Sequence, residues 1–427
     1  MGQNGQGTAR WNAIVLILIF ASLFAASCAR EQAAEPPARQ AGAPLPIVRV
    51  RVLEREESVK LRVTAAPTVK TALYAKSLRL NMAAGKSATL ALTPKGWTIG
   101  GVAVPGSGIL TITPSQDASL SVNGRAYHGS YRFVPTRDGT FDVINDVDID
   151  SYLKGVLARE LLSGWAEETY RAQDIAARTY ALYVAGKTKG SGNWDLSSDE
   201  RSQVYGGVTD ETAMSRKAVD DTAGIVLAYG QPGRERIFKA YYSACCGGVT
   251  QSAADAFGEN YVVPLSDQDA RGLCRTAPRF NWAPVEITKA ELTRRLQEYG
   301  RKRRDNKDND PLDQQIQSLS RLEIQSVNRF NRPIRFVAID ADGTRYSLLA
   351  EELRNAINRA GSANIHSTFM KVVNEPGSEV IRFVEGHGDG HGVGMCQWCS
   401  QIRAQAGMQH EDIVLSAFPR SKLVRAY

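Results

Sequence analysis

The sequence predicts an α+β fold, in which a β-rich N-terminal module precedes a core of mixed helices and antiparallel sheet. Two patterns carry this prediction. Short segments of alternating polar and apolar residues fill residues 47–145, and apolar residues at helical spacing begin after residue 145. Runs of strands followed by helices and mixed elements indicate α+β rather than a regular βαβ alternation. We therefore expect two parts, residues 47–145 and residues 146–427.

The N-terminal segment has the pattern of an export signal. Arg10 precedes an apolar run, "WNAIVLILIFASLFAASC", which is shorter than the roughly 20 residues of a membrane span. A basic residue, an apolar run and small residues before a cleavage point are typical of secretory signals; an uncleaved anchor helix is the alternative. The small residues before Cys28 resemble a bacterial lipobox, although Ala25 stands where leucine is usual. We expect a lipoprotein-type signal peptide at residues 1–27 and a lipid anchor on Cys28.

Residues 28–46 and the net charge of the chain limit the kinds of binding partner that we expect. Residues 28–46 are rich in Ala and Pro without periodicity, which is typical of a flexible tether. The 427-residue chain carries a net charge of +7, which suits nucleic acid, anionic lipid or an acidic polysaccharide. Because the protein is expected to be exported and to face the periplasm or cell surface, we expect no nucleic-acid partner.

Seven segments of the N-terminal module have the alternating pattern of β-strands. The segments "IVRVRVLE", "SVKLRV", "GKSATLAL", "KGWTIGG", "GILTITP", "ASLSVNGRAYHGSYRFVP" and "GTFDVIND" alternate with Gly, Asn-Gly and Asp-Gly turn signals. This spacing predicts antiparallel strands and hairpins. The module contains no obvious cluster of catalytic residues.

The elements of the core follow a different periodicity. Two helices are predicted at about residues 150–162 and 166–186, separated by Ser163-Gly164. The segments "GIVLAYG" and "RIFKAYYSACCGG" are expected to pair as strands, and "ITKAELTRRLQEYG" to form a helix. A charged, solvated insert is predicted near residues 300–315, followed by a three-stranded meander and the helix "AEELRNAINRA".

One carboxylate stands out on the first helix. Glu160 lies one turn beyond Val156, near the middle of an apolar stripe formed by Ile149, Tyr152, Leu153, Val156 and Leu157. A carboxyl group in apolar surroundings resists ionisation, so its pKa rises toward that of a general acid. Two alternatives are a helix-end residue clear of the core and an ion pair with Arg178 or Arg171. The spacing makes Glu160 a candidate catalytic acid.

Five cysteines follow the predicted signal. They are Cys245, Cys246, Cys274, Cys396 and Cys399. Outside the cytosol cysteines commonly form disulfides, and an odd number leaves at least one thiol unpaired. One or two disulfides with a buried thiol is the favoured interpretation, and a metal cluster is the alternative.

Several blocks of the core resemble one known family. The stretch "DIDSYLKGVLARELLSGWAEETYRAQDIAARTYAL" is similar to the central motif of the stage II sporulation protein D (SpoIID/LytB) family. The resemblance continues through "QVYGG", "AVDDTAGIVLAYG", "YYSACCGGVTQSA", "LCRTAPRFNW", "HSTFMKV" and "GHGVGMCQW". In order and spacing these blocks cover roughly residues 47–427.

The resemblance implies a SpoIID-like fold and an envelope enzyme of the lytic transglycosylase type, which cleaves peptidoglycan glycan strands. It also implies that Glu160, which ends the first helix, is the catalytic acid. In such enzymes the C6 hydroxyl of muramic acid attacks the anomeric carbon, so one glutamate acts first as acid and then as base. The absence of an obvious second carboxylate near Glu160 agrees with this chemistry, because most glycosidases use two carboxylates.

The resemblance further implies a set of substrate-contacting or cleft-shaping positions and no cofactor. These positions are Gln173, Arg178, Gln203, Tyr205, Ser243, His391 and Gln397. Gln173 and Arg178 lie five positions apart, so they do not share one strip of the helix; one could orient Glu160 while the other is structural.

This chain departs from the family at two points. Some relatives bind zinc through a Cys and a His before "QVY", but Ser198 and Arg201 stand in that neighbourhood here. We therefore expect no metal at that place. Cys399 replaces the family glycine after "QW" and creates a C-x-x-C with Cys396. By the resemblance we prefer a Cys246–Cys274 disulfide, with Cys396 paired to Cys399 or Cys245 as a further possibility.

Two other classes of function remain open. A non-catalytic glycan-binding envelope lipoprotein would keep the fold without turnover. A metallohydrolase would use His387, Asp389 and His391, perhaps with cysteines, since His, Asp and Cys are common metal ligands. Against the second, the stretch "GHGDGHGVGMCQWC" is expected to be a glycine-rich loop that enters a helix and lets backbone approach the glycan. His387 and Asp389 lie outside the family match.

Overall fold

The computed structural model describes residues 44–427 apart from residues 66–67, 72–77, 80–84, 116–118, 305–315 and 359–363. The predicted signal peptide, Cys28 and most of the predicted tether lie outside the described residues. Within the described part of the chain, no helix combines the length and the apolar character needed to cross a membrane.

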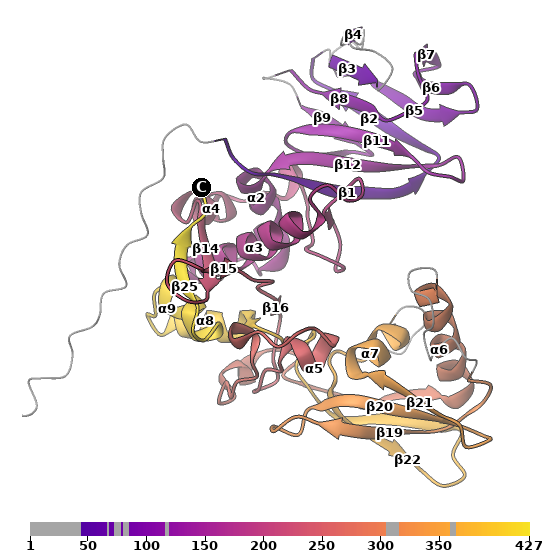
Figure 1. Ribbon diagram of the computed structural model, residues 1–427, viewed down its shortest axis with the longest axis vertical. Helices are drawn as coiled ribbons and strands as arrows, with labels where there is room; N and C mark the ends of the chain where they lie inside the picture. The colour runs from indigo at the N-terminus through magenta and orange to yellow at the C-terminus, as the bar shows by residue number, and fades with distance from the viewer. Residues whose placement is uncertain are drawn as a thin grey trace, which may run out of the picture. The chain divides into compact units, whose positions relative to one another are not determined.

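The N-terminal strands form two sheets (Figure 1). The strands of the seven-stranded sheet are β1 (Ile47–Glu56), β3 (Thr68–Thr71), β4 (Leu78–Arg79), β8 (Leu110–Thr113), β11 (Ser130–Pro135), β12 (Phe141–Asp148) and β13 (Leu196–Ser197). Their spatial order is β13-β1-β12-β11-β8-β3-β4. The strands of the six-stranded sheet are β2 (Ser58–Val63), β5 (Ser87–Thr93), β6 (Gly96–Ile99), β7 (Val102–Val104), β9 (Leu120–Val122) and β10 (Arg125–Ala126). Their order is β10-β9-β2-β5-β6-β7.

Aromatic side chains join the two sheets. Trp97 of β6 meets Phe141 of β12 edge-on, with ring centroids 5.1 Å apart, and contacts Phe133 of β11 in the same way. Strand β2 alternates exposed and buried residues along its whole length, as expected for a strand with one face on the core. The prediction of an α+β fold with antiparallel strands in this module is confirmed.

Six helices among the described residues belong to the next part of the core, and the first of them begins directly after β12. They are α2 (Ile149–Glu160), α3 (Glu167–Thr188), α4 (Ala213–Asp221), α5 (Ala253–Phe257), α8 (Gln397–Gln405) and α9 (His410–Ala417). The Asp148 carboxylate accepts the N–H of Ser151 at 2.9 Å and so caps α2. Helix α2 ends at Glu160 because Leu161 already has extended backbone, with φ −115° and ψ 150°. The expected end at residue 162 was therefore two residues too late.

The pairing of the next strands differs from the expectation. The strands are β14 (Ile225–Tyr229), β15 (Arg236–Ile237), β16 (Tyr242–Ser243), β24 (Met395–Cys396) and β25 (Lys422–Arg425). The expected hairpin covers only two residue pairs of β14 and β15, and β14 pairs mainly with β25 at the end of the chain. Strand β16 pairs in parallel with β24. These partners lie far along the chain, so the local pattern could not reveal them.

A second apolar core lies in residues 281–387. It contains the strands β17 (Asn281–Trp282), β18 (Val285–Thr288), β22 (Phe369–Asn374) and β23 (Val380–His387), and the meander β19 (Leu319–Val327), β20 (Pro333–Asp340) and β21 (Arg345–Leu349). Helices α6 (Lys289–Arg304) and α7 (Ala350–Asn358) lie over the meander (Figure 1). The predicted meander and both helices are confirmed, but residues 301–304 of the predicted insert continue α6 instead of forming a loop.

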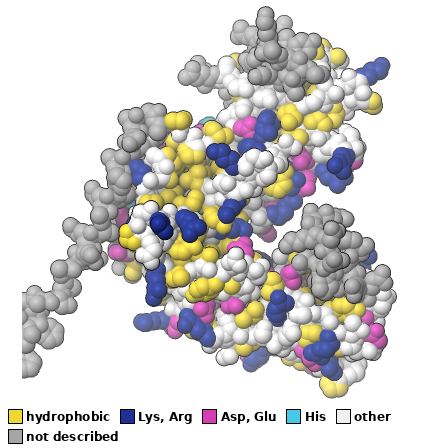
Figure 2. Space-filling view, viewed as in Figure 1, with side chains coloured by type: hydrophobic (Ala, Val, Ile, Leu, Met, Phe, Trp, Pro, Cys, Tyr) yellow, Lys and Arg dark blue, Asp and Glu magenta, His cyan; other side chains and the backbone are white. Residues whose placement is uncertain are grey.

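Three short 3₁₀ turns complete the described elements: η1 (Val208–Asp210), η2 (Val263–Leu265) and η3 (Leu273–Thr276). The predicted boundary after residue 145 falls inside β12, and one apolar core includes Val48 of the sheets together with Phe418 near the C-terminus. The division into two parts stays a prediction. On the face drawn in Figure 2, Lys and Arg side chains lie in several separate groups between carboxylates rather than in one basic patch.

Candidate active site

A cavity of about 310 Å³ opens beside the end of α2. Four segments line it: the end of α2 with the residues that follow, the loop after β16, the segment after η3, and the glycine-rich loop with the start of α8. The lining residues are Glu160, Leu162, Trp165, Ala244, Cys245, Ala277, Pro278, Arg279, Asp389, Gln397 and Trp398. The cavity therefore collects residues from across the core around the carboxylate that the sequence singled out.

Glu160 sits at the cavity wall with both carboxylate oxygens engaged. The backbone N–H of Val204 donates to Oε1 at 3.0 Å, and Nε2 of Gln397 donates to Oε2 at 3.5 Å. Burial raises the pKa of Glu160 above its usual value, and the hydrogen bonds from Val204, Gln397 and Tyr242 oppose that rise only in part. A carboxyl group that holds its proton more tightly than usual and borders a cavity is suited to general acid catalysis.

Neither ion pair considered for Glu160 forms. Arg171 binds Glu167, Glu168 and Asp221. Arg178 binds Asp174 and Asp150, at 2.5 and 3.2 Å. Among the described residues Glu160 makes no salt bridge, so no cation stabilises its ionised form there.

A hydrogen-bonded group of polar side chains supports the segment that holds Glu160. Gln203 donates through Nε2 to the hydroxyl of Tyr242 at 2.9 Å, and its Oε1 accepts the hydroxyl of Tyr152 at 3.1 Å. Gln203 directly precedes Val204, whose N–H holds Glu160. Its side chain is 1 % exposed, so it positions the backbone behind the carboxylate and does not line the cavity.

Two tryptophans and an ion pair form the rest of the wall. Trp165 and Trp398 meet edge-on, with ring centroids 5.1 Å apart and an interplanar angle of 72°. Arg279 donates to the carboxylate of Asp389 at 3.0 Å. None of these four residues was among the predicted residues of the transglycosylase site, although Asp389 was a ligand of the alternative metallohydrolase. Trp165, Trp398 and Arg279 each fall within a quoted family block, which was a usable signal, whereas Asp389 lies outside the family match and meets Arg279 only through the fold.

The glycine-rich loop brings Asp389 to the cavity by a close backbone approach. Asp389 and Cys245 exchange backbone hydrogen bonds of 3.0 and 2.8 Å. Gly388 has φ +86°, and a Cβ there would lie 2.7 Å from the carbonyl oxygen of Cys245. Only glycine meets both requirements. The loop then enters α8 at Gln397 as expected, so the glycines serve contact between two backbone segments of the protein itself.

Two predicted residues shape this loop from behind. The hydroxyl of Ser243 accepts the N–H of Gly392 at 3.2 Å. Nδ1 of His391 accepts the N–H of Val393 at 3.0 Å, while the ring packs edge-on against Tyr241 and Phe257. Burial lowers the pKa of His391 to about 4, so the imidazole is neutral at physiological pH. Neither residue lines the cavity.

Two further predicted residues, Tyr205 and Arg178, lie inside the core. Tyr205 is buried against Tyr127 and Tyr152, and its hydroxyl donates to Asn145 at 3.2 Å. The fully buried Arg178 adds hydrogen bonds to Tyr427 and the carbonyl of Thr222 to its ion pairs. These contacts give Tyr205 and Arg178 packing roles, and the cavity does not include them.

Gln173 differs from the other buried predicted residues. Its side chain is fully buried, and neither its amide nitrogen nor its carbonyl oxygen has a hydrogen-bond partner among the described residues. Buried polar groups are usually paired. Gln173 does not line the cavity.

The residues of the alternative metallohydrolase do not assemble. Nδ1 of His387 lies 2.7 Å from Oδ1 of Asn281, Asp389 binds Arg279, and His391 lies between aromatic rings. Arg201, near the place where some relatives bind zinc, is paired with Glu54 and Asp199. In the described part of the chain, the one group of three or more His, Cys, Asp or Glu side chains placed to hold a metal ion consists of cysteines alone.

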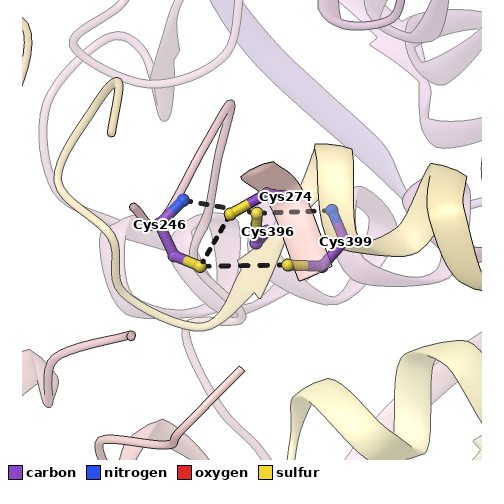
Figure 3. Close-up of side chains that lie close together, drawn as sticks. All are labelled: Cys246, Cys274, Cys396 and Cys399. Carbon is purple, nitrogen blue, oxygen red and sulfur yellow. Dashed lines mark hydrogen bonds between the residues drawn. The ribbon is translucent and has the colours of Figure 1, made fainter. Parts of the chain in front are cut away.

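That group is formed by Cys246, Cys274, Cys396 and Cys399 (Figure 3). The sulfurs of Cys246 and Cys274 are 3.5 Å apart, and all five described cysteines are free. A disulfide requires about 2.05 Å, so the preferred Cys246–Cys274 disulfide is not present, and neither is a bond from Cys396 to Cys399 or Cys245. The four thiols converge on a common centre instead of pairing.

Comparisons with known proteins find one family domain and several distant relatives. A family model described as stage II sporulation protein matches residues 137–229, which include Glu160, Gln173, Arg178, Gln203 and Tyr205. An uncharacterized protein of Brachyspira hyodysenteriae is 29% identical over 300 residues, which are 70% of this chain and 72% of that protein. The amidase enhancer of Bacillus subtilis is 25% identical over 341 residues, covering 72% of this chain and 45% of its own length. An uncharacterized protein of Chlamydia muridarum is 31% identical over 182 residues, 42% of this chain and 62% of that protein. Residues 137–229 of this chain are therefore a SpoIID family domain, and the amidase enhancer is a distant homologue over 72% of the chain.

Proposed function

We propose that this protein is a peptidoglycan lytic transglycosylase with Glu160 as its acid and base. The observation that carries the proposal is the Glu160 carboxyl, whose pKa burial raises and which borders a cavity lined by Trp165 and Trp398. Tryptophan rings offer apolar faces of the size of a sugar ring. The substrate is a glycan strand of alternating N-acetylglucosamine and N-acetylmuramic acid.

The reaction needs only one proton carrier. Glu160 gives its proton to the glycosidic oxygen as the bond to the muramic-acid C1 breaks. The carboxylate then takes the proton of the C6 hydroxyl as that oxygen bonds to C1, which closes a 1,6-anhydro ring and restores the acid. Gln397 holds the carboxylate in place through both halves. No water enters the product.

Asp389 is a second carboxylate in the same cavity. Its pairing with Arg279 occupies one of its oxygens and balances its charge. We assign the pair to the cavity wall and substrate positioning, because the single-glutamate route needs no second base. If Asp389 instead activated water, the product would carry a reducing end without the anhydro ring.

A non-catalytic role is the second candidate. It is favoured by the likeness to a protein named amidase enhancer. Under this reading the chain binds glycan strands in the envelope and raises the activity of an amidase, and the cavity is a binding site without turnover. Both readings share an exported lipoprotein anchored through Cys28, with peptidoglycan and not nucleic acid as its partner.

One assay separates the two readings. The full chain is incubated with purified glycan strands, either bearing or stripped of stem peptides, and the products are analysed by mass spectrometry. The enzyme is expected to release 1,6-anhydro-muramic-acid ends, with the peptide-stripped strands as the better substrate. Strands that co-sediment with the chain but remain uncut under all conditions would contradict the enzyme and favour the binding role.

A further inference from the structure

The four-cysteine cluster beside the cavity has the geometry of a closed metal site. The sulfurs of Cys246, Cys274, Cys396 and Cys399 all lie within 4.8 Å of one another. The distance from Cys246 to Cys274 is 3.5 Å, and that from Cys246 to Cys399 is 3.9 Å. Four thiolates about 2.3 Å from one Zn²⁺ in a tetrahedron lie about 3.8 Å apart. The two measured separations, 3.5 and 3.9 Å, lie on either side of that value.

Backbone N–H groups in the cluster donate hydrogen bonds to one of the four sulfurs, that of Cys396. The N–H groups of Cys246 and Cys399 donate to the sulfur of Cys396, at 3.3 and 3.4 Å (Figure 3). Cys396 is also the N-cap of α8, so its sulfur faces the positive end of that helix. Both features stabilise negative charge on the sulfur, which is the form that binds a metal ion.

Burial and ligand number define the kind of site. All four cysteines are at most 5 % exposed. They come from the loop after β16, from η3, from the end of β24 and from the first turn of α8. Four protein ligands in a tetrahedron leave no open position, as in structural rather than catalytic zinc sites. A cluster of several irons would hold its thiolates further apart, because irons and sulfides lie between them, so the spacing favours a single ion.

A buried cation lies against the same cluster. Arg332 is fully buried, and its guanidinium donates to the carbonyl oxygens of Cys246, Val249 and His391, at 3.1–3.3 Å. Within the described residues it forms no salt bridge. The buried carboxylate of Glu351 acts on this charge without forming an ion pair with it, and a buried charge without a direct ion pair is costly. One Zn²⁺ with four thiolates carries a net charge of −2, and Arg332 would offset half of it.

We propose that Cys246, Cys274, Cys396 and Cys399 bind one Zn²⁺ as a structural tetrathiolate site, with release of the four thiol protons. The site joins three of the segments that line the cavity. Cys245 directly precedes the ligand Cys246, and Gln397 directly follows the ligand Cys396. Both Cys245 and Gln397 line the cavity. The zinc thereby fixes the position of Gln397 against Glu160. The site stands independently of the proposed transglycosylase activity.

The decisive measurement uses the unmodified protein. The full chain is purified without chelator and without a metal-affinity column, and its metal content is measured by inductively coupled plasma mass spectrometry. We expect one zinc per chain. A metal-free chain, or one holding stoichiometric iron in place of zinc, would overturn the assignment.

Cysteine mapping in the same sample tests the competing redox state. The chain is denatured with chelator and alkylating reagent but without reductant, then digested and analysed by mass spectrometry. All four ligand cysteines should be alkylated there, and protected in the native protein without chelator. Peptides joined by disulfides among these four positions would contradict the zinc site, whatever the enzymatic activity of the sample.

A matched pair of variants tests which sulfurs bind. Cys399→Ser is expected to lose most of the zinc, whereas Cys245→Ser, which alters a buried neighbour outside the four-sulfur group, should keep one zinc per chain. If Cys245→Ser loses zinc as completely as Cys399→Ser, the ligand set is wrong. Should Cys399→Ser fail to fold, the metal content and cysteine mapping of the unmodified chain still decide.

Discussion

The cavity and the cysteine cluster share two segments in which neighbouring residues lie in different environments. In the loop after β16, Cys245 lines the cavity and Cys246 joins the cluster; at the start of α8, Cys396 joins the cluster and Gln397 lines the cavity. In each segment the two neighbouring residues thus face different sides, one toward the cavity and the other toward the cluster. One side keeps polar groups at a surface that substrate can reach, and the other packs sulfur in the interior. In both segments, a residue that lines the cavity is thus the direct neighbour of a cysteine of the cluster.

The largest effect should come from replacing the proposed acid. Glu160→Gln keeps the shape of the side chain but cannot transfer a proton, so release of anhydro ends should fall by about 10²–10⁴-fold or more. Circular dichroism and zinc content should match the unaltered chain, because Glu160 is not part of the cluster. Substantial activity in this variant would remove Glu160 from the mechanism.

Loss of the metal from the cysteine cluster should lower the stability of the folded chain. Cys399→Ser is expected to lower the free energy of unfolding by about 4 kcal/mol or more, since loss of a metal site is among the few large single-residue effects. Cys245→Ser should cost far less, because it removes no ligand. Denaturant unfolding of the two variants side by side checks this contrast. Equal stability of both would mean that the cluster carries no structural metal.

The hydrogen bond from Gln397, which directly follows the cluster residue Cys396, to Glu160 should affect the pH profile of activity. Gln397 lowers the pKa of Glu160, so Gln397→Ala should raise that pKa further. The protonated acid would persist to higher pH, and the alkaline limb of kcat/KM should move upward. The rate should fall by about tenfold because the carboxyl is less well held. A profile that moves to lower pH, or does not move, would contradict the contact between Gln397 and Glu160.

Substitution of the second carboxylate should have a smaller effect. Asp389→Asn removes one partner of the Arg279 pair but no proton carrier, so we expect a loss of at most about fivefold. The decisive measurement is mass spectrometry of the products, which should still carry 1,6-anhydro ends. Loss of turnover as severe as in Glu160→Gln would indicate a two-carboxylate hydrolase.

The smallest effect concerns stability. Because burial raises the folded-state pKa of Glu160 above its unfolded value, the folded chain binds the proton more tightly between those two pKa values. The group's contribution is fully present below the unfolded pKa and is lost as pH rises through the folded pKa. Glu160→Gln should therefore be slightly more stable than the unaltered chain at neutral pH and lose this advantage near pH 4, where the carboxyl of the unfolded chain is protonated as well. Thermal unfolding at both pH values checks the sign.

Much of the fold could be predicted because it depends on residues close together in the chain. Alternation along β2 and the apolar stripe of α2 are local patterns, and both elements form where they were expected. The parallel pairing of β16 with β24 could not be predicted this way, because their partners are some 150 residues apart. Family blocks led to Gln397, which meets Glu160, but equally to Arg178, whose buried ion network lies away from the cavity.

The sequence alone identified a glutamate on the buried face of a helix, a β-rich module before it and five cysteines without a defined pairing. These follow from helix and strand periodicity, which a few neighbouring residues determine. Only the tertiary structure placed Gln397 against a carboxylate 237 positions away and Asp389 in the same cavity. Only it gathered four thiols around one centre, because contacts between distant segments depend on the path of the whole chain and on the burial it produces.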